Sequence, residues 1–135
     1  MSGCSALSGM GATVRKGRYD IVTAAEPLPG AFATVSAGGN PTSVVAQGSY
    51  TPEAVSHRDA GWRIISIDAV LPLDLTGVLA TLSGWLSHEG IPLFCISSFE
   101  TDHLLVREQD TAAACASLAR HGMAVRDEEG APLRF

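Results

Sequence analysis

The chain has 135 residues, of which 46% are hydrophobic and 17% are charged, and its formal net charge at pH 7 is −5. This length can bury one core, or two small half-domains that share one. The negative charge argues against a protein that binds nucleic acid or an anionic membrane surface, and no apolar run approaches the roughly 20 residues that cross a bilayer.

The cysteines and histidines show no spacing that is typical of a zinc site. Cys4, Cys95 and Cys115 are an odd set at wide spacing, so free thiols in a reducing cytoplasm are a simpler interpretation than a structural or intermolecular disulfide. Residues 1–10 lack the basic and apolar segments of a secretory signal. We therefore predict a cytoplasmic protein with no metal and no cofactor.

The first half of the chain carries weak signals. Residues 1–16 are rich in Gly and Ser and predict a flexible tail. Short strand-like runs follow, interrupted by Pro27–Gly30 and by a turn at Gly38–Pro41, and Thr51-Pro52-Glu53 favours one helical turn. The predicted strands are residues 18–23, 32–35 and 43–47.

The second half begins with a strand and a helix. Residues 62–71 alternate around Ile65 and Ile67 and predict a strand that Pro72 ends. A helix capped by Asp74 or Thr76 is expected to run to about His88, since its apolar residues fall three and four positions apart. These residues are Leu75, Val78, Leu79, Leu82, Trp85 and Leu86.

A hairpin, a second helix and a last strand complete the second half. Residues 91–97 and 103–107 are two apolar runs around a short polar tip, which indicates an antiparallel hairpin. A helix capped by Asp110 or Thr111 is expected to end at Gly122, and residues 123–125 return as a strand.

The order strand, helix, strand, strand, helix, strand predicts an α+β fold, the ferredoxin-like βαββαβ arrangement with two helices on one side of a sheet. The first half has similar strand content and weaker helices, so we expect a tandem pair with a degenerate first unit, although no residue-level repeat is visible. The predicted parts are a tail at 1–16, the degenerate unit at 17–60, the complete unit at 61–127 and a tail at 128–135.

Three segments in this order resemble the ACT domain family. They are Gly61-Trp62-Arg63, the helix start Leu73–Ala80, and Gly90–Val106 with Asp102-His103 at the hairpin tip. More narrowly, the chain is similar to small bacterial proteins of two tandem ACT-like units, which are related to the ACT modules of animal cytosolic arginine sensors.

The resemblance implies a ferredoxin-like fold that pairs side by side through its sheets. It also implies a small ligand, often an amino acid, bound between ACT units, and no intrinsic catalysis. At residues 39–42 family members often have an acidic residue before the strand, and this chain has none, which puts contacts from the first unit in doubt.

The helix start at Thr76, Gly77 and Val78 is one candidate for ligand binding. Unpaired N–H groups and the partial positive charge of a helix N-terminus suit a carboxylate, and glycine allows a close approach. The alternative is a capped helix with a packing glycine.

The hairpin tip is the other candidate. The Asp102 carboxylate can pair with the ammonium or a cationic side chain of an amino acid, or it can stabilise its own turn. His103 points to the opposite face by alternation, where it either binds a ligand or senses pH, or has a structural role in lining the sheet interface or bonding a neighbour. The remaining candidates either surround a ligand or satisfy the turn and the packing, and they are Ser97, Ser98, Phe99 and Thr101.

Catalysis and nucleic-acid binding fit the residues poorly. There is no Gly-x-Ser-x-Gly turn, and Asp102 and His103 are adjacent, so on a strand they diverge rather than align for acyl transfer. An RNA-recognition module shares the βαββαβ order but needs stacking aromatics and a basic surface. The chain is therefore not expected to be an enzyme.

Two functions remain open from the sequence. The first is a regulatory protein that binds an amino acid between ACT-like units, within the chain or across a homodimer. The second is a protein that forms oligomers or docks a partner and takes no small ligand. Replacing Asp102 by Ala discriminates them, since only the first function needs this carboxylate.

Overall fold

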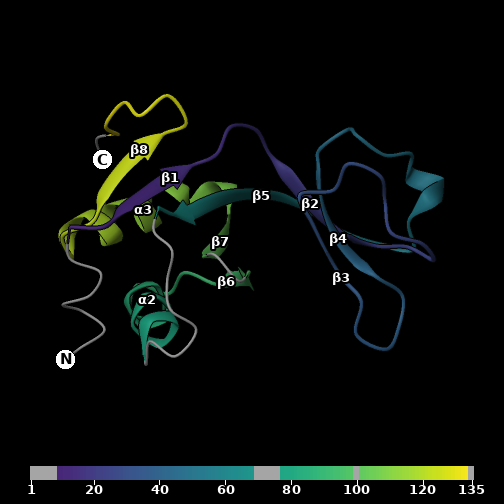
Figure 1. Ribbon diagram of the computed structural model, residues 1–135, viewed down its shortest axis with the longest axis horizontal. Helices are drawn as coiled ribbons and strands as arrows, with labels where there is room; N and C mark the ends of the chain where they lie inside the picture. Colours follow the sequence, from purple (N-terminus) through teal and green to yellow (C-terminus); the bar gives the residue numbers. More distant parts are fainter. Residues whose placement is uncertain (1–8, 69–76, 99–100, 134–135) are drawn as a thin grey trace. The chain divides into compact units, whose positions relative to one another are not determined.

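The structure is a computed structural model that describes residues 9–68, 77–98 and 101–133 (Figure 1). Two compact units divide the chain. Unit 1 takes in the chain up to Lys16 and from Arg63 onward, and unit 2 is Gly17–Trp62. The long strand β5 (His57–Ile67) passes from unit 2 into unit 1.

The sheet of unit 1 has the strand order β6-β7-β5-β1-β8. Its other strands are β1 (Gly11–Val14), β6 (Leu93–Ser97), β7 (Asp102–Arg107) and β8 (Ala124–Asp127). The helices are α2 (Val78–His88) and α3 (Thr111–Arg120), the latter preceded by the 3-10 turn η2 (Glu108–Asp110). The chain order β5-α2-β6-β7-α3-β8 is the ferredoxin-like βαββαβ arrangement, so the predicted fold class is confirmed.

Helix α2 buries a narrow stripe. Val78, Leu82 and Leu86 are four positions apart, so they fall on one face of the helix, and all three are buried. The helix begins after Gly77, whose φ of 84° is in the left-handed region. It ends where Ile91 N–H donates to the Leu86 carbonyl oxygen, which satisfies one of the terminal acceptors.

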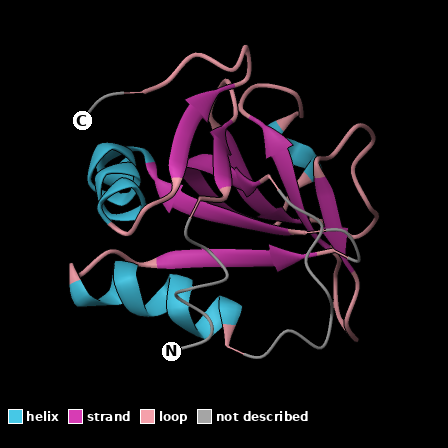
Figure 2. Ribbon diagram, turned by 60° about the vertical axis from the view of Figure 1, so that its left-hand side comes forward, coloured by secondary structure: helices cyan, strands magenta, loops and turns pink. Residues whose placement is uncertain are grey.

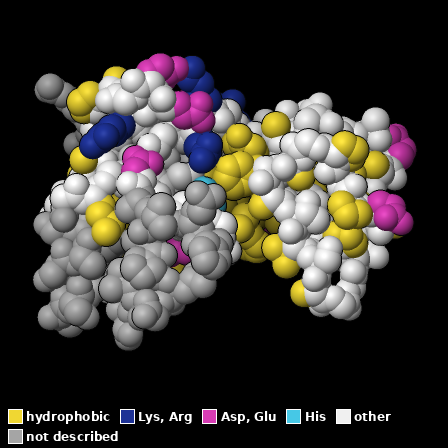
Figure 3. Space-filling model, in the orientation of Figure 1, with side chains coloured by type: hydrophobic (Ala, Val, Ile, Leu, Met, Phe, Trp, Pro, Cys, Tyr) yellow, Lys and Arg dark blue, Asp and Glu magenta, His cyan; other side chains and the backbone are white. Residues whose placement is uncertain are grey.

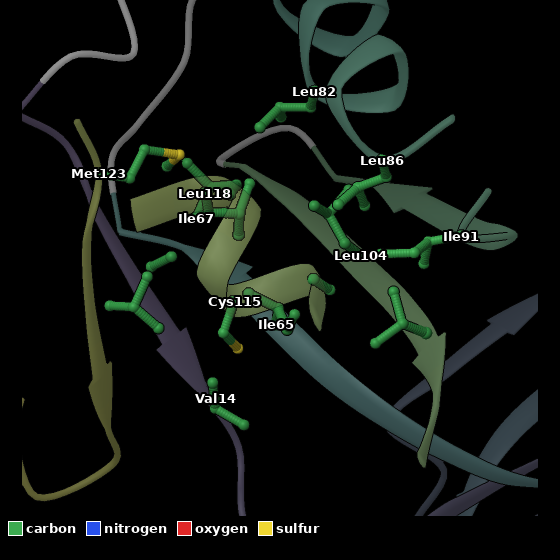
Figure 4. Packing of buried hydrophobic residues seen from close by; sticks show 14 of the residues in the cluster. Val14, Ile65, Ile67, Leu82, Leu86, Ile91, Leu104, Cys115, Leu118 and Met123 are labelled. Carbon is green, nitrogen blue, oxygen red and sulfur yellow. The ribbon is translucent and has the colours of Figure 1, made fainter. Parts of the chain in front are cut away.

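One hydrophobic cluster lies between the two helices and one face of the sheet. Figure 4 shows Leu86 of α2, Leu104 of β7 and Leu118 of α3 converging on it. Alternate residues of each strand contribute, such as Ile65 and Ile67 of β5, which is what a pleated strand requires. The helices α2 and α3 thus cover the same face of this sheet (Figure 2).

Unit 2 contains strands but no α-helix, and the structure describes all of its residues. Its elements are β2 (Tyr19–Thr23), β3 (Ala33–Val35), β4 (Thr42–Ala46), the first part of β5 and the 3-10 turn η1 (Pro52–Ala54). The order is β3-β4-β2-β5. Asp20 is buried and accepts hydrogen bonds from the Tyr50 hydroxyl at 2.6 Å and the Gly61 N–H at 3.3 Å. A buried carboxylate is tolerated when it is bonded in this way.

Most predicted elements are confirmed, including the strands of unit 2, the hairpin, the second helix and the last strand. The descent of unit 2 from an ACT-like repeat stays a prediction. The strand that we placed at 62–71 begins earlier, at His57, and residues 69–71 lie outside the described part. The residue before α2 is Gly77; Asp74 and Thr76, the predicted caps, lie outside the described residues.

The prediction of a flexible tail at 1–16 was wrong for residues 11–14. These residues form β1, which pairs antiparallel with β5 (Ala12 with Ile67) and parallel with β8 (Gly11 with Ala124). A strand with a neighbour on each side can be short and need not alternate, so its sequence gives little signal. The predicted tail at 128–135 also makes contacts, because Leu133 packs against the core and Pro132 bridges to Arg126.

Candidate functional site

The hairpin tip is held together by its own hydroxyl groups. The Ser98 hydroxyl donates to the Thr101 carbonyl oxygen at 3.0 Å and accepts from the Thr101 N–H at 3.2 Å. The Thr101 hydroxyl donates to the Ile67 carbonyl oxygen at 2.7 Å, which joins the tip to the end of β5. The Ser98 hydroxyl is therefore bonded within the turn and the Thr101 hydroxyl to β5, while a role of either residue in ligand binding stays a prediction. Phe99 lies outside the described residues.

Ser97 and Asp102 lie on the helix-covered side of the hairpin. Leu104 and Val106 of β7 are in the core, so alternation places Asp102 on the same side. Ser97 pairs with Asp102 in the register of the hairpin. Burial chiefly raises the pKa of the nearby Cys95 thiol, and the Asp102 charge raises it further. The register of the hairpin thus places Ser97 opposite Asp102, where β6 ends and β7 begins.

His103 lies on the other side of the sheet and is occupied there. Its Nδ1 is 2.8 Å from the Ser66 hydroxyl, which accepts a hydrogen bond from Arg15 Nε at 2.7 Å. Because Ser66 accepts from Arg15, its own proton can point at Nδ1, which puts the proton of the neutral ring on Nε2. Burial and then the Arg15 charge lower the pKa of His103, against a smaller opposite effect of Asp102. His103 thus joins strands, as one of the two sequence interpretations held.

The start of α2 offers N–H groups that no side chain of the described residues is seen to cap. Gly77 is the N-cap residue, is exposed, and has no side chain that could reach back to the first turn. Its carbonyl oxygen accepts from the Thr81 N–H at 2.8 Å. Val78 is buried in the core, so its side chain cannot contact a ligand from the groove, although its backbone N–H belongs to the uncapped turn.

A groove of about 750 Å³ runs between α2 and β6. Helix residues from Leu79 to Ser87 line it together with Leu93 and Cys95 of β6, so the helix and the strand lie alongside each other. The loop from His88 to Leu93 is short, and the two elements therefore run in opposite directions. Both are about 16 Å long by their rise per residue, so the start of α2 lies near the end of β6. Gly77 and the Ser97–Asp102 pair are accordingly expected just beyond the same end of the groove, although none of the three is among its lining residues.

The groove itself was missed by the sequence analysis. Its lining consists of Leu79, Ala80, Ser83, Gly84, Ser87, Gly90, Ile91, Pro92, Leu93 and Cys95. A signal existed in the small residues of α2, since Ala80, Ser83, Gly84 and Ser87 recur at spacings of three and four on the side away from the core. Small residues on one helix face leave room for a ligand or a second chain.

A second groove, of about 460 Å³, lies where α2 meets α3. Trp85 and His121 stack there with ring centroids 4.1 Å apart and planes 11° from parallel. Arg120 forms an ion pair with Glu89, and the Ser117 hydroxyl and Arg120 lower the pKa of Glu89. His121 Nδ1 donates to the Ser117 carbonyl oxygen at 2.8 Å, which fixes the ring. These contacts join the two helices.

The face of the molecule seen in Figure 3 carries basic and acidic side chains next to each other over unit 1, and Lys16 and Glu129 form an ion pair. Within the described ranges, no three His, Cys, Asp or Glu side chains are grouped so that they could hold a metal ion. Neither α2 nor α3, nor any other helix described here, has both the length and the apolar character to span a bilayer.

Comparisons with known proteins connect this geometry to a family. A family model described as ACT domain matches residues 57–120, which include β5, α2, the hairpin and α3. No curated protein matches the chain.

Solved structures share the fold over nearly the whole chain. A protein of Agrobacterium tumefaciens is similar with a TM-score of 0.76 and 25% identity, covering 93% of this chain and 98% of that one. A Vibrio cholerae protein described as a possible transport protein has a TM-score of 0.72 and 19% identity, with 86% and 92% covered. The regulatory subunit of aspartate kinase from Thermus thermophilus, in a ligand-free form, has a TM-score of 0.58 and 10% identity, with 85% and 98% covered.

Proposed function

Because this chain belongs to the ACT domain family, with the domain matched at residues 57–120, we propose that it is a non-catalytic regulatory protein that binds an amino acid. ACT domains are regulatory modules, and the similar structures include the regulatory subunit of aspartate kinase. The free thiols of Cys95 and Cys115 fit a cytoplasmic location.

The observation that carries the proposal is the shared end of the α2–β6 groove. There the uncapped N-terminus of α2 and the Asp102 carboxylate provide opposite charges, which match the two charged groups that every amino acid has. The ligand carboxylate accepts hydrogen bonds from the N–H groups of Gly77, Val78 and the turn that follows. The ligand ammonium pairs with Asp102, with the Ser97 hydroxyl beside it. Thr76 and Phe99 remain proposed neighbours of this end.

A second copy of the chain completes the site. In the described part of unit 1, β6 pairs with β7 alone, so its other edge carries backbone N–H and C=O groups without a strand partner. A homodimer that pairs β6 with β6 of another copy covers the groove and places the ligand between ACT domains.

Isothermal titration calorimetry with each of the twenty amino acids tests the binding. We expect one group of amino acids to bind the protein, and Asp102→Asn to weaken that binding at least tenfold, since a charge-assisted hydrogen bond is lost. Asp110→Asn is the matched control, because Asp110 precedes α3 and makes no capping bond. A folded protein that binds none of the twenty contradicts the proposal.

The second candidate function is an oligomerising protein without a small ligand, and the open edge of β6 is the observation that favours it. Analytical ultracentrifugation separates the two. Under this alternative the oligomer has the same size in Asp102→Asn as in the unchanged protein, and no amino acid alters it. A ligand that stabilises the dimer supports the first function instead.

A further inference from the structure

We infer that the ligand of the α2–β6 groove is an amino acid with an uncharged aliphatic side chain of the size of valine, leucine, isoleucine or methionine. This inference rests on the proposed function and specifies its ligand class. It follows from what the walls of the groove offer to the side chain once the two charged groups of the ligand are held at one end.

The walls of the groove carry no charge among the residues that the structure describes. None of its ten lining residues is Asp, Glu, Lys, Arg or His. The larger ones are apolar, with Leu79 on the helix side and Leu93 on the strand side. A charged side chain laid between them would lose water without gaining a partner, whereas an aliphatic side chain is favoured by each methylene group that leaves water.

The hydroxyl groups along the helix wall do not make the groove more favourable for a charged side chain. The Ser83 hydroxyl donates to the Ala80 carbonyl oxygen at 3.3 Å, so it is bonded within its own helix. The Cys95 thiol on the opposite wall is half-buried, and burial raises its pKa, so it stays protonated and uncharged at neutral pH. The groove therefore presents a mainly apolar surface, with the Ser83 hydroxyl bonded within its own helix and an uncharged Cys95 thiol.

The position of Asp102 argues against the main alternative, a ligand with a cationic side chain such as lysine or arginine. If Asp102 bound the cationic side chain of lysine or arginine, the ammonium and carboxylate of the ligand would have to lie in the uncharged part of the groove. If Asp102 binds the ammonium, only the side chain enters that part. The second arrangement leaves no charge without a partner.

The width of the groove fits a branched side chain. On the helix wall Ala80 and Gly84 project little or nothing, and a Cβ added to Gly84 would meet no atom within 4 Å. The volume of about 750 Å³ exceeds what any one side chain fills, so a methionine, leucine or isoleucine side chain has room beside Leu79. Glycine, alanine and serine have too little apolar surface to cover Leu79 and Leu93, so we expect them to bind more weakly.

The test is a calorimetric comparison of leucine, isoleucine, valine and methionine with lysine, arginine, aspartate, glutamate and serine. We expect the tightest aliphatic ligand to bind at least tenfold more tightly than any charged one. A lysine or arginine that binds most tightly overturns the inference and leaves the proposed function standing. Absence of binding by all twenty amino acids, with circular dichroism showing a folded protein, overturns both.

A variant of the groove wall provides a second readout. Leu79 is 40% exposed, so Leu79→Gln should keep the fold and α2 while it weakens leucine binding roughly fivefold. Val35→Thr is the matched control, since Val35 is an exposed hydrophobic residue of unit 2 at 47% and lies on β3. Equal leucine affinity in Leu79→Gln and the unchanged protein contradicts the inference.

Protection of Cys95 locates the ligand. In a Cys4→Ser background, the saturating aliphatic ligand should slow the reaction of Cys95 with iodoacetamide several-fold, because Cys95 lines the groove. Cys115 is fully buried and serves as the internal control. Binding that leaves the Cys95 rate unchanged places the ligand elsewhere and overturns the inference.

Discussion

Asp102 and His103 are neighbours in the sequence, and their side chains lie on opposite faces of the sheet of unit 1. Asp102 lies with Ser97 on the side of the helices, at the end of an apolar groove. His103 lies on the other side and bonds Ser66, which also accepts from Arg15. The comparison shows that a polar hairpin tip need not act as one site, because alternation places its side chains on two different faces of the sheet.

The largest expected effect tests the core that supports the helix side. Leu104→Ala should lower the free energy of unfolding by about 3 kcal/mol, because Leu104 is fully buried and its loss leaves a cavity. Urea denaturation followed by circular dichroism measures this. Leu79→Ala, at a half-exposed position, is the control and should cost less than about 1 kcal/mol. An equal loss of unfolding free energy in Leu104→Ala and Leu79→Ala would show that the helix side is not the main core.

The next effect tests the hydrogen bonds of the opposite side. Ser66→Ala should cost about 1–2 kcal/mol, since a buried hydroxyl that contacts both Arg15 and His103 is removed. The double variant Ser66→Ala/His103→Gln should cost less than the sum of the two single variants, because the same bond is broken in each. Additive costs in urea denaturation would mean that the two residues act separately.

A smaller effect is a dependence of stability on pH. Burial, followed by the Arg15 charge, holds the pKa of His103 below its ordinary value of 6.5, so the unfolded chain binds a proton more readily than the folded one. This part of the stability is complete above pH 6.5 and is lost as the pH falls from there toward the folded pKa. Between pH 7.5 and 5, the Tm of the unchanged protein should therefore decrease more steeply than that of His103→Gln. Parallel curves of Tm against pH would show that His103 does not contribute to the pH dependence.

The smallest effect tests whether Asp102 shares the side of Cys95. Asp102→Asn should lower the pKa of Cys95, because the Asp102 charge helps to raise it. In a Cys4→Ser background without ligand, the iodoacetamide rate of Cys95 at pH 8 should rise about twofold. Asp110→Asn should leave the rate unchanged. Burial raises the pKa of Cys115 to about 11, so this thiol should react much more slowly in all variants.

The sequence predicted the elements that have strong periodicity. The stripe at Val78, Leu82 and Leu86 identified α2, and the apolar runs around residues 98–102 identified the hairpin. Alternation along β7 also predicted that Asp102 and His103 diverge. These features are local, so a single segment carries the whole signal.

The features that the sequence did not predict depend on distant residues. Strand β1 was taken for a tail because Gly11–Val14 becomes a strand only between β5 and β8. The bond from His103 to Ser66 joins residues 37 positions apart, and the groove needs both α2 and β6. The sequence left the hydroxyls of Ser98 and Thr101 open to a ligand or a turn, and it gave no sign that Thr101 bonds the Ile67 carbonyl oxygen, 34 positions away.

The pairing of Gly11 with Ala124 has a consequence for protein synthesis. On the ribosome β1 emerges first among the strands of unit 1, and its parallel partner β8 emerges last. The sheet cannot close until the residues of β8 have left the exit tunnel, and a connection of that length is slow to close. Until then the buried side of β1 and its neighbours is exposed, and this is the period in which a chaperone would be needed.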